Sequence, residues 1–109
     1  DFTFVDDIVD GTLRLGVVPE ALGQAFNLAS ETETRVIDIA NMVNELAGNS
    51  SGVQYIARRD WDKITRRRAS IEKAGKVLGY KPKMKIKEVI QRTFNWVNEN
   101  KKNIEASIK

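Results

Sequence analysis

Arginine is the residue type in this sequence with the clearest chemical use. Two groups stand eight residues apart, Arg58-Arg59 and Arg66-Arg67-Arg68. A guanidinium group forks onto two oxygens of a phosphate or a carboxylate, which the point charge of lysine cannot do. The two groups therefore indicate a diphosphate or a carboxylate partner.

Other reactive side chains are scarce. The 109 residues include no cysteine and no histidine, which excludes disulfides, thiolate metal sites and the commonest general base. The pair Asp6-Asp7 could be acid–base machinery, but it follows an apolar run and precedes a helical pattern. Capping of a helix N-terminus explains these carboxylates better than catalysis does.

The net charge of +3 raises the possibility of a nucleic-acid partner. Lysines 81, 83, 85 and 87 are best explained as a solvated face, because acidic residues are interspersed along the chain. An alternative function is a small basic module that engages RNA or an acidic protein through Arg58–Arg68. Only Tyr55 and Trp61 lie near enough to stack on bases, and we expect Trp61 to pack against the domain, so nucleic acid is the weaker hypothesis.

The length suits one small domain, 1–109. The sequence starts at Asp1 rather than Met, with a strand-like pattern from the first residues, so we expect a fragment of a larger protein. No apolar run is long enough to cross a bilayer and no secretory signal is recognisable, which favours a cytoplasmic protein without a membrane partner.

Three short segments alternate in the manner of strands. They are residues 1–5, 24–29 and 53–57. Between and after them, helical patterns are predicted to begin at Asp6 or Asp7, at Thr34, at Ser70 and at Ile86. The first three should end near Gly16, Gly48 and Gly79, and the last could extend to Ile108. We expect a mixed α/β fold of short strands and four to five helices.

So few strands do not make an independent sheet of ordinary size. The isolated chain should therefore leave apolar surface that another domain covers, with a homodimer or marginal stability as the other outcomes.

Five segments in order resemble one enzyme family, the extended short-chain dehydrogenase/reductases that act as NAD-dependent nucleoside-diphosphate-sugar epimerases and dehydratases. They are Asp1-Phe-Thr-Phe-Val-Asp-Asp-Ile-Val-Asp-Gly11, Phe26-Asn-Leu-Ala-Ser30, Thr34-Arg-Val-Ile-Asp-Ile-Ala40, Arg59-Asp-Trp-Asp62 and Ser70-Ile-Glu-Lys-Ala-Gly-Lys-Val-Leu-Gly-Tyr-Lys-Pro82. The resemblance covers essentially the whole chain and places it in the C-terminal, substrate-binding part of such enzymes.

The resemblance implies a division of labour. A preceding Rossmann domain would bind NAD and transfer hydride through a keto-sugar intermediate, as in enzymes of the UDP-glucose 4-epimerase type. The family's Tyr-x-x-x-Lys catalytic pair is absent here, since Tyr55 is followed four positions on by Arg59 and Tyr80 by Met84. The resemblance thus implies no catalytic residue, no cofactor bound by this chain, and no activity of the chain alone.

The resemblance also assigns the binding residues. Arg59 would grip the diphosphate of a nucleoside-diphosphate sugar, and Asp62 would contact a ribose hydroxyl or orient the loop. Arg58 and Arg67 are further candidate phosphate contacts, with Arg66 and Arg68 behind them. Trp61 stands where the family usually has glycine, which leaves the exact substrate open.

Overall fold

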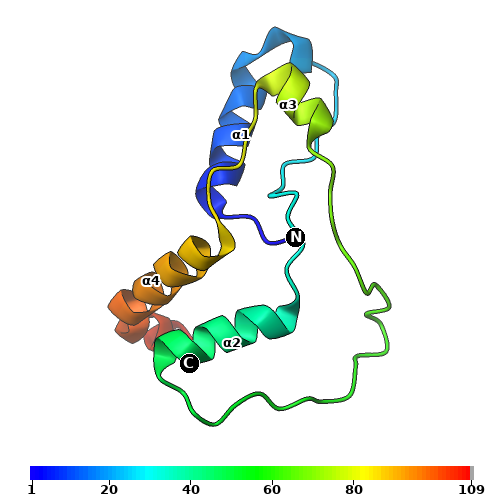
Figure 1. The fold of residues 1–109 in the computed structure, drawn as a ribbon. Coiled ribbons are helices and arrows are strands. Elements are labelled where there is room, and N and C mark those ends of the chain that lie inside the picture. Colours follow the sequence, from blue (N-terminus) through cyan, green and yellow to red (C-terminus); the bar gives the residue numbers. More distant parts are fainter. Residues whose placement is uncertain (109) are drawn as a thin grey trace. The chain divides into compact units, whose positions relative to one another are not determined.

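The computed structural model describes residues 1–108, which form helices joined by extended segments. The elements in chain order are α1 (Val5–Val17), the short 3-10 helix η1 (Pro19–Ala21), α2 (Val36–Ala47), α3 (Glu72–Leu78) and α4 (Ile86–Ser107) (Figure 1). They divide into two compact units. Unit 1 contains residues 1–34 and 57–84, and unit 2 contains residues 35–56 and the described part of 85–109.

The predicted α/β fold is wrong. Residues 1–108 contain no strand, and the three segments predicted as strands are extended or enter a helix. Val5 already belongs to α1, while 24–29 and 53–57 have no regular structure. A strand exists only where its backbone groups pair with those of a neighbour, and an alternating pattern cannot supply that neighbour.

In unit 1, side chains accept hydrogen bonds from backbone N–H groups that would pair with a neighbouring strand in a sheet. The Asp1 carboxylate accepts the backbone N–H groups of Ser30 at 3.0 Å and Glu31 at 3.1 Å. Once a side chain has satisfied these donors, no backbone pairing is required there.

The core of unit 1 lies where α1 and α3 pack together (Figure 1). Ala74, Leu78 and Tyr80 are almost fully buried, and Leu28 and other half-buried apolar side chains surround them. Gly11 on α1 allows this close packing, since a Cβ there would lie 2.7 Å from a Leu28 methyl carbon. The helix α3 ends as predicted at Gly79, whose φ of 62° suits glycine.

Two side chains of α1 tie this helix to the segment after α3. Asp7 is buried, and its carboxylate accepts the backbone N–H groups of Lys83 at 2.9 Å and Met84 at 3.2 Å. Arg14 donates to the carbonyls of Leu78 and Gly79 at the C-terminus of α3. The capping role predicted for Asp7 is therefore wrong: α1 has no side-chain cap, and the carboxylate anchors a distant segment instead.

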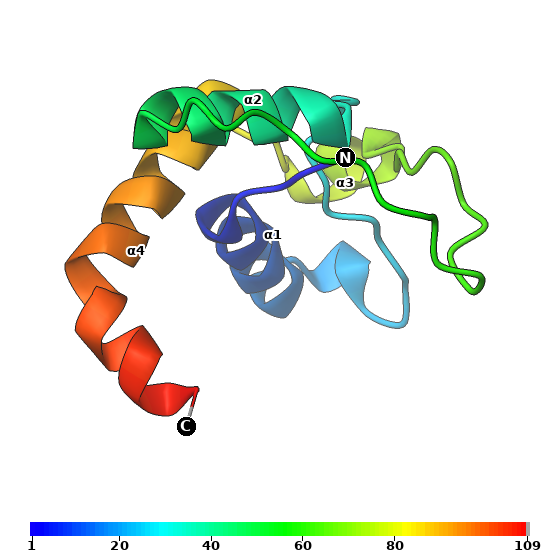
Figure 2. The ribbon, with the colours of Figure 1, turned by 90° about the horizontal axis from the view of Figure 1, so that it is seen from below.

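Unit 2 consists of α2 packed against α4, joined to an extended stretch, 48–56 (Figure 2). The helix α2 ends at Gly48, as predicted, with a φ of 62°. The continuation of the last helix beyond Val97 is confirmed, because α4 runs to Ser107. Neither helix has a fully buried residue. Among residues 1–108, no helix combines the length and the apolar character that crossing a membrane would demand.

Candidate functional site

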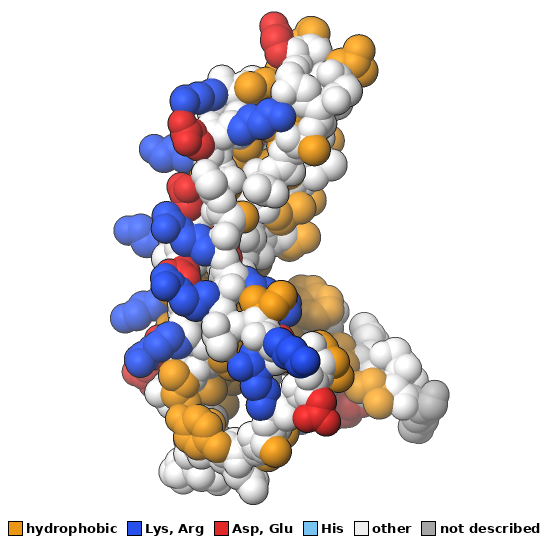
Figure 3. All heavy atoms as spheres, turned by 90° about the vertical axis from the view of Figure 1, so that its right-hand side faces the viewer, with side chains coloured by type: hydrophobic (Ala, Val, Ile, Leu, Met, Phe, Trp, Pro, Cys, Tyr) orange, Lys and Arg blue, Asp and Glu red, His pale blue; other side chains and the backbone are white. Residues whose placement is uncertain are grey.

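The arginine segment, which we define as residues 58–68, lies in unit 1 as an extended stretch with a turn at 60–61. Its second half runs antiparallel to residues 31–33. Arg66 forms a two-pronged ion pair with Glu33, at 2.9 and 2.5 Å, and Arg68 Nε donates to the Glu31 carbonyl at 3.0 Å. Blue side chains gather on the face that carries this segment, with red ones among them (Figure 3).

The Asp1 carboxylate holds the same two stretches together from the other side. Besides the N–H groups of Ser30 and Glu31, it accepts the Ser30 hydroxyl at 2.6 Å and the Ala69 N–H at 3.5 Å. Glu31 has a φ of 58°, which is unusual for a residue with a Cβ. The carboxylate therefore fixes a strained turn and the end of the arginine segment at one point.

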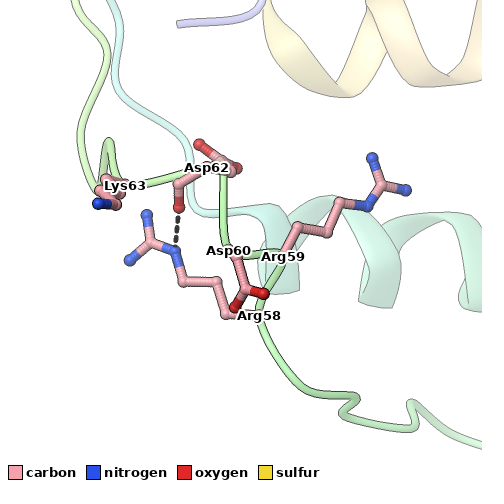
Figure 4. Close-up of a pocket in the computed structure, with 5 residues that line it drawn as sticks. All are labelled: Arg58, Arg59, Asp60, Asp62 and Lys63. Carbon is pink, nitrogen blue, oxygen red and sulfur yellow. Dashed lines mark hydrogen bonds between the residues drawn. The ribbon is translucent and has the colours of Figure 1, made fainter.

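Two arginines shape the loop at the turn. Arg58 Nε donates to the backbone carbonyl of Asp62 (Figure 4). Arg67 donates to the Asp62 carboxylate at 3.3 Å. Both ties converge on Asp62. The resulting open pocket of about 260 Å³ is lined by Arg58, Arg59, Asp60, Asp62 and Lys63.

Arg59 differs from the other four arginines of the segment. Arg58, Arg66, Arg67 and Arg68 each donate a hydrogen bond to a carbonyl or carboxylate of the chain. Among the described residues, the Arg59 guanidinium has no such acceptor, and it lies over the Trp61 ring, 5.4 Å from the centroid. Figure 4 shows Arg59 extending away from Arg58 and Asp62. Its five N–H donors remain available to a ligand.

The expected packing of Trp61 against the domain is wrong. Its side chain is 73% exposed and lies at the turn, with the Arg59 guanidinium over the ring. A large aromatic ring exposed beside an unpaired cation is typical of binding surfaces rather than of cores.

Ion pairing sets the electrostatics of the segment. The hydrogen bonds from Arg66 are the main cause that lowers the pKa of Glu33 below its ordinary value of 4.5, and the charges of Arg66 and Arg68 act in the same direction. Glu33 therefore stays ionised and neutralises part of the positive charge. Positive charge is left over at the turn, where Arg59 and Lys63 line the pocket.

The structure thus brings together the four predicted binding residues, Arg58, Arg59, Asp62 and Arg67, and gives them different surroundings. Asp1 and Glu33, which hold the segment in place, were not identified from the sequence. Each contacts partners more than thirty residues away along the chain. No local pattern carries such a signal.

The described residues offer no group of three or more acidic, histidine or cysteine side chains that could hold a metal ion. They do not fit NAD either. A dinucleotide fingerprint needs clustered glycines between a strand and a helix. Here Gly48 and Gly79 end helices, Gly11 and Gly75 lie within helices, and no strand precedes any of them in residues 1–108.

Comparison with known proteins places the chain in a family. No family model matches it. The chain is 34% identical over 105 residues to UDP-glucuronate 4-epimerase of Thermodesulfobacterium geofontis, covering 92% of this chain and 30% of that enzyme. It superposes on the epimerase Mth375 of Methanothermobacter thermautotrophicus with a TM-score of 0.96 and 48% identity, over 98% of this chain and 32% of that one. The chain belongs to the extended short-chain dehydrogenase/reductase family, in which its relatives include UDP-sugar epimerases and decarboxylases.

A second solved family member, WbmF of Bordetella bronchiseptica, was crystallised with NAD⁺ and UDP. Its TM-score is 0.82 at 32% identity, over 97% of this chain and 31% of that one. The present chain spans about a third of the length of these epimerase-family relatives and corresponds to their C-terminal part.

Proposed function

We propose that this chain, residues 1–109, is the substrate-binding domain of an NAD-dependent nucleotide-sugar epimerase, and that the arginine segment binds the diphosphate of the nucleoside-diphosphate sugar. The observation that carries the proposal is the unpaired guanidinium of Arg59. Four arginines of the segment are already engaged with the protein, and the fifth, which lines an open pocket, has no acceptor among the described residues.

Arg59 is then the residue that grips the diphosphate. A guanidinium donates two parallel hydrogen bonds to phosphate oxygens, and charge-assisted bonds of this kind are roughly twice as strong as neutral ones. Arg58 and Arg67 differ from Arg59, since each gives a donor to the carbonyl or the carboxylate of Asp62. They hold the loop in a shape that presents Arg59.

Asp62 has a double role in this proposal. One carboxylate oxygen accepts from Arg67, which orients the loop. The side chain remains 40% exposed, so it can also accept a hydrogen bond from a ribose hydroxyl. Hydroxyl recognition would let the site distinguish a nucleoside diphosphate from inorganic pyrophosphate.

Hydride transfer would take place in another part of the enzyme. NAD would be bound by a Rossmann domain, because these residues offer no dinucleotide site. An apolar stripe on α1 supports the presence of a covering domain. Val5, Val9, Leu13 and Val17 recur at four-residue spacing and are 49–78% exposed in the chain alone.

Titration of the chain with UDP and with inorganic pyrophosphate tests this function. Arg59→Ala should weaken binding of both ligands by about tenfold or more, the loss expected when one charged hydrogen-bond donor is removed. Arg59→Lys keeps the charge but loses the fork, so it should recover only part of the affinity. Isothermal calorimetry at fixed ionic strength measures these differences.

Arg35→Ala is the matched control, because it removes one positive charge from an exposed ion pair in unit 2. It should leave the affinity unchanged. Equal losses from Arg59→Ala and Arg35→Ala, or affinity that falls steeply with salt and ignores the nucleotide, would instead indicate a general polyanion surface such as an RNA-binding module.

A further inference from the structure

Trp61 and Arg59 form a pair on the exposed side of the arginine segment. The guanidinium carbon of Arg59 lies 5.4 Å from the Trp61 ring centroid, within the range of a cation–π contact. In the loop sequence Arg59-Asp-Trp-Asp62, two carboxylates lie within three residues of Arg59. An arginine in such a sequence would ordinarily pair with one of them.

Asp62 is engaged by two other arginines of the segment. The carboxylate of Asp62 accepts from Arg67 at 3.3 Å, and its backbone carbonyl accepts from Arg58. Figure 4 shows Arg59 leading away from these groups. Among residues 1–108, the group that engages the Arg59 guanidinium is an uncharged aromatic face.

Stacking affects binding differently from ion pairing. A carboxylate partner would occupy the N–H donors of Arg59, and a diphosphate would have to displace it. An aromatic ring contacts the face of the guanidinium, whereas the N–H groups lie in its plane and point outward. Stacking also restricts a long flexible side chain, which would otherwise lose rotamer freedom when a ligand orders it.

We propose that Trp61 is a positioning residue that holds the Arg59 guanidinium ready for the diphosphate while leaving its donors free. The proposal rests on the function proposed above, since it takes the diphosphate as the ligand of Arg59. Trp61 itself need not touch the ligand. The residue would thus tune affinity at the phosphate end of the substrate, and not select the base.

A double-mutant cycle with pyrophosphate as the probe tests this inference. Pyrophosphate carries no base or sugar, so any effect of Trp61 on its binding must pass through the phosphate site. Trp61→Leu should weaken binding about two- to fivefold, which corresponds to the value of an exposed cation–π contact. Trp61→Phe, which keeps an aromatic face, should retain most of the affinity. In an Arg59→Ala background, Trp61→Leu should have no further effect.

Side-chain NMR gives an independent readout. The Nε–H signal of Arg59 and the indole signal of Trp61 should shift together during the titration, while the indole signal of Trp96, in unit 2, stays in place. Trp61 is 73% exposed, so none of its substitutions should unfold the chain. Thermal melting of each variant checks this point.

Three results would overturn the inference. Trp61→Leu could leave pyrophosphate binding unchanged while Arg59→Ala still weakens it, which removes the positioning role but preserves the proposed function. Trp61→Leu could weaken binding equally with and without Arg59, which would indicate a separate contact between Trp61 and the ligand. If Arg59→Ala itself has no effect on binding, the proposed function fails, and the inference fails with it.

Discussion

The two units of this chain are held together in different ways. In unit 1, buried carboxylate and hydroxyl groups join segments more than fifty residues apart, as in the bonds from Lys83 to Asp7 and from Tyr80 to Ala29. Unit 2 has local ion pairs, at three- and four-residue spacing along α2 and α4, and neither helix has a fully buried residue. The candidate site belongs to the unit with long-range bonds, which fix its extended segments without a sheet.

Truncation of a core aromatic residue should cause the largest loss of stability. Tyr80 is 3% exposed, and burial, with the charge of Asp7, raises the pKa of its hydroxyl, which donates to the Ala29 carbonyl at 3.2 Å. Tyr80→Ala should lower the free energy of unfolding by about 3 kcal/mol, because it leaves a cavity and an unpaired carbonyl. Urea denaturation followed by circular dichroism measures this loss.

Trp96→Ala in unit 2 is the matched control for Tyr80→Ala. Trp96 is of similar size but 57% exposed, so its removal should change the stability much less. If the two substitutions lower the free energy of unfolding equally, unit 2 has a core comparable to that of unit 1, and the distinction between the units fails.

Removal of the Asp7 carboxylate should cause the second-largest loss of stability. Asp7→Ala leaves the N–H groups of Lys83 and Met84 without their acceptor in a part-buried place. We expect a loss of about 2 kcal/mol, since an unsatisfied buried donor costs about 1–3 kcal/mol. Hydrogen exchange of the Lys83 and Met84 amides should quicken in the variant. A capping role would instead speed exchange in the first turn of α1.

Substitution of Asp1 should act on the site more than on the core. Asp1→Ala removes the acceptor of the Ser30, Glu31 and Ala69 N–H groups, at a cost of about 1 kcal/mol for exposed or part-buried bonds. The main result should be a weaker affinity for UDP, with a smaller fall in melting temperature than Asp7→Ala causes. Calorimetry and thermal melting of one sample separate the two effects, and a lower melting temperature with unchanged affinity would contradict the expectation.

The smallest expected effect is the dependence of stability on pH. Because Arg66 lowers the pKa of Glu33, the folded state binds this proton less readily than the unfolded state. The stabilisation by this pair is therefore complete above the ordinary pKa of 4.5 and is lost as the pH falls through the lowered folded value. Carboxyl NMR titration should show the shift in the native chain.

The pKa of Asp38 in unit 2 is also lowered, by hydrogen bonds from Arg35 three residues away. In Asp1→Ala the pKa of Glu33 should move back toward 4.5, because the Arg66–Glu33 pair depends on the tertiary fold. That of Asp38 should stay lowered, since its partner is on the same turn. Parallel behaviour of the two carboxyl groups would contradict the distinction between long-range and local pairing.

The helices could be predicted from the sequence because their signals are local. The three- and four-residue spacing that begins at Ile86 gave α4, and Gly48 and Gly79 ended helices where glycine was needed. The strands could not be predicted, because an alternating pattern such as 24–29 describes one segment and says nothing about a neighbour. Asp7 shows the same limit. A carboxylate that caps a helix and one that anchors a distant segment look alike in the sequence. Only the position of Lys83 in the fold distinguishes the two roles.

The candidate binding residues were chosen by resemblance, and their different surroundings required the structure. Arg58, Arg59 and Arg67 are equivalent as sequence, yet two of them bind Asp62 and the third lies over Trp61. The exposure of Trp61 could not be inferred, since the same residue buried in a loop has the same neighbours along the chain. The resemblance ranked Arg59 first, but it could not show that the other four arginines donate hydrogen bonds to the protein.

The ties on either side of the turn also bear on how this loop can change in evolution. Arg66 and Arg68 fix the outgoing segment of the loop to residues 31–33. Residues 63–65 form no hydrogen bond or ion pair with that frame in the described part of the chain. Insertions or replacements in this interval would leave the frame intact. Related enzymes could thus acquire new substrate preferences by exchanging a short stretch of loop, without renewed selection on the fold that carries it.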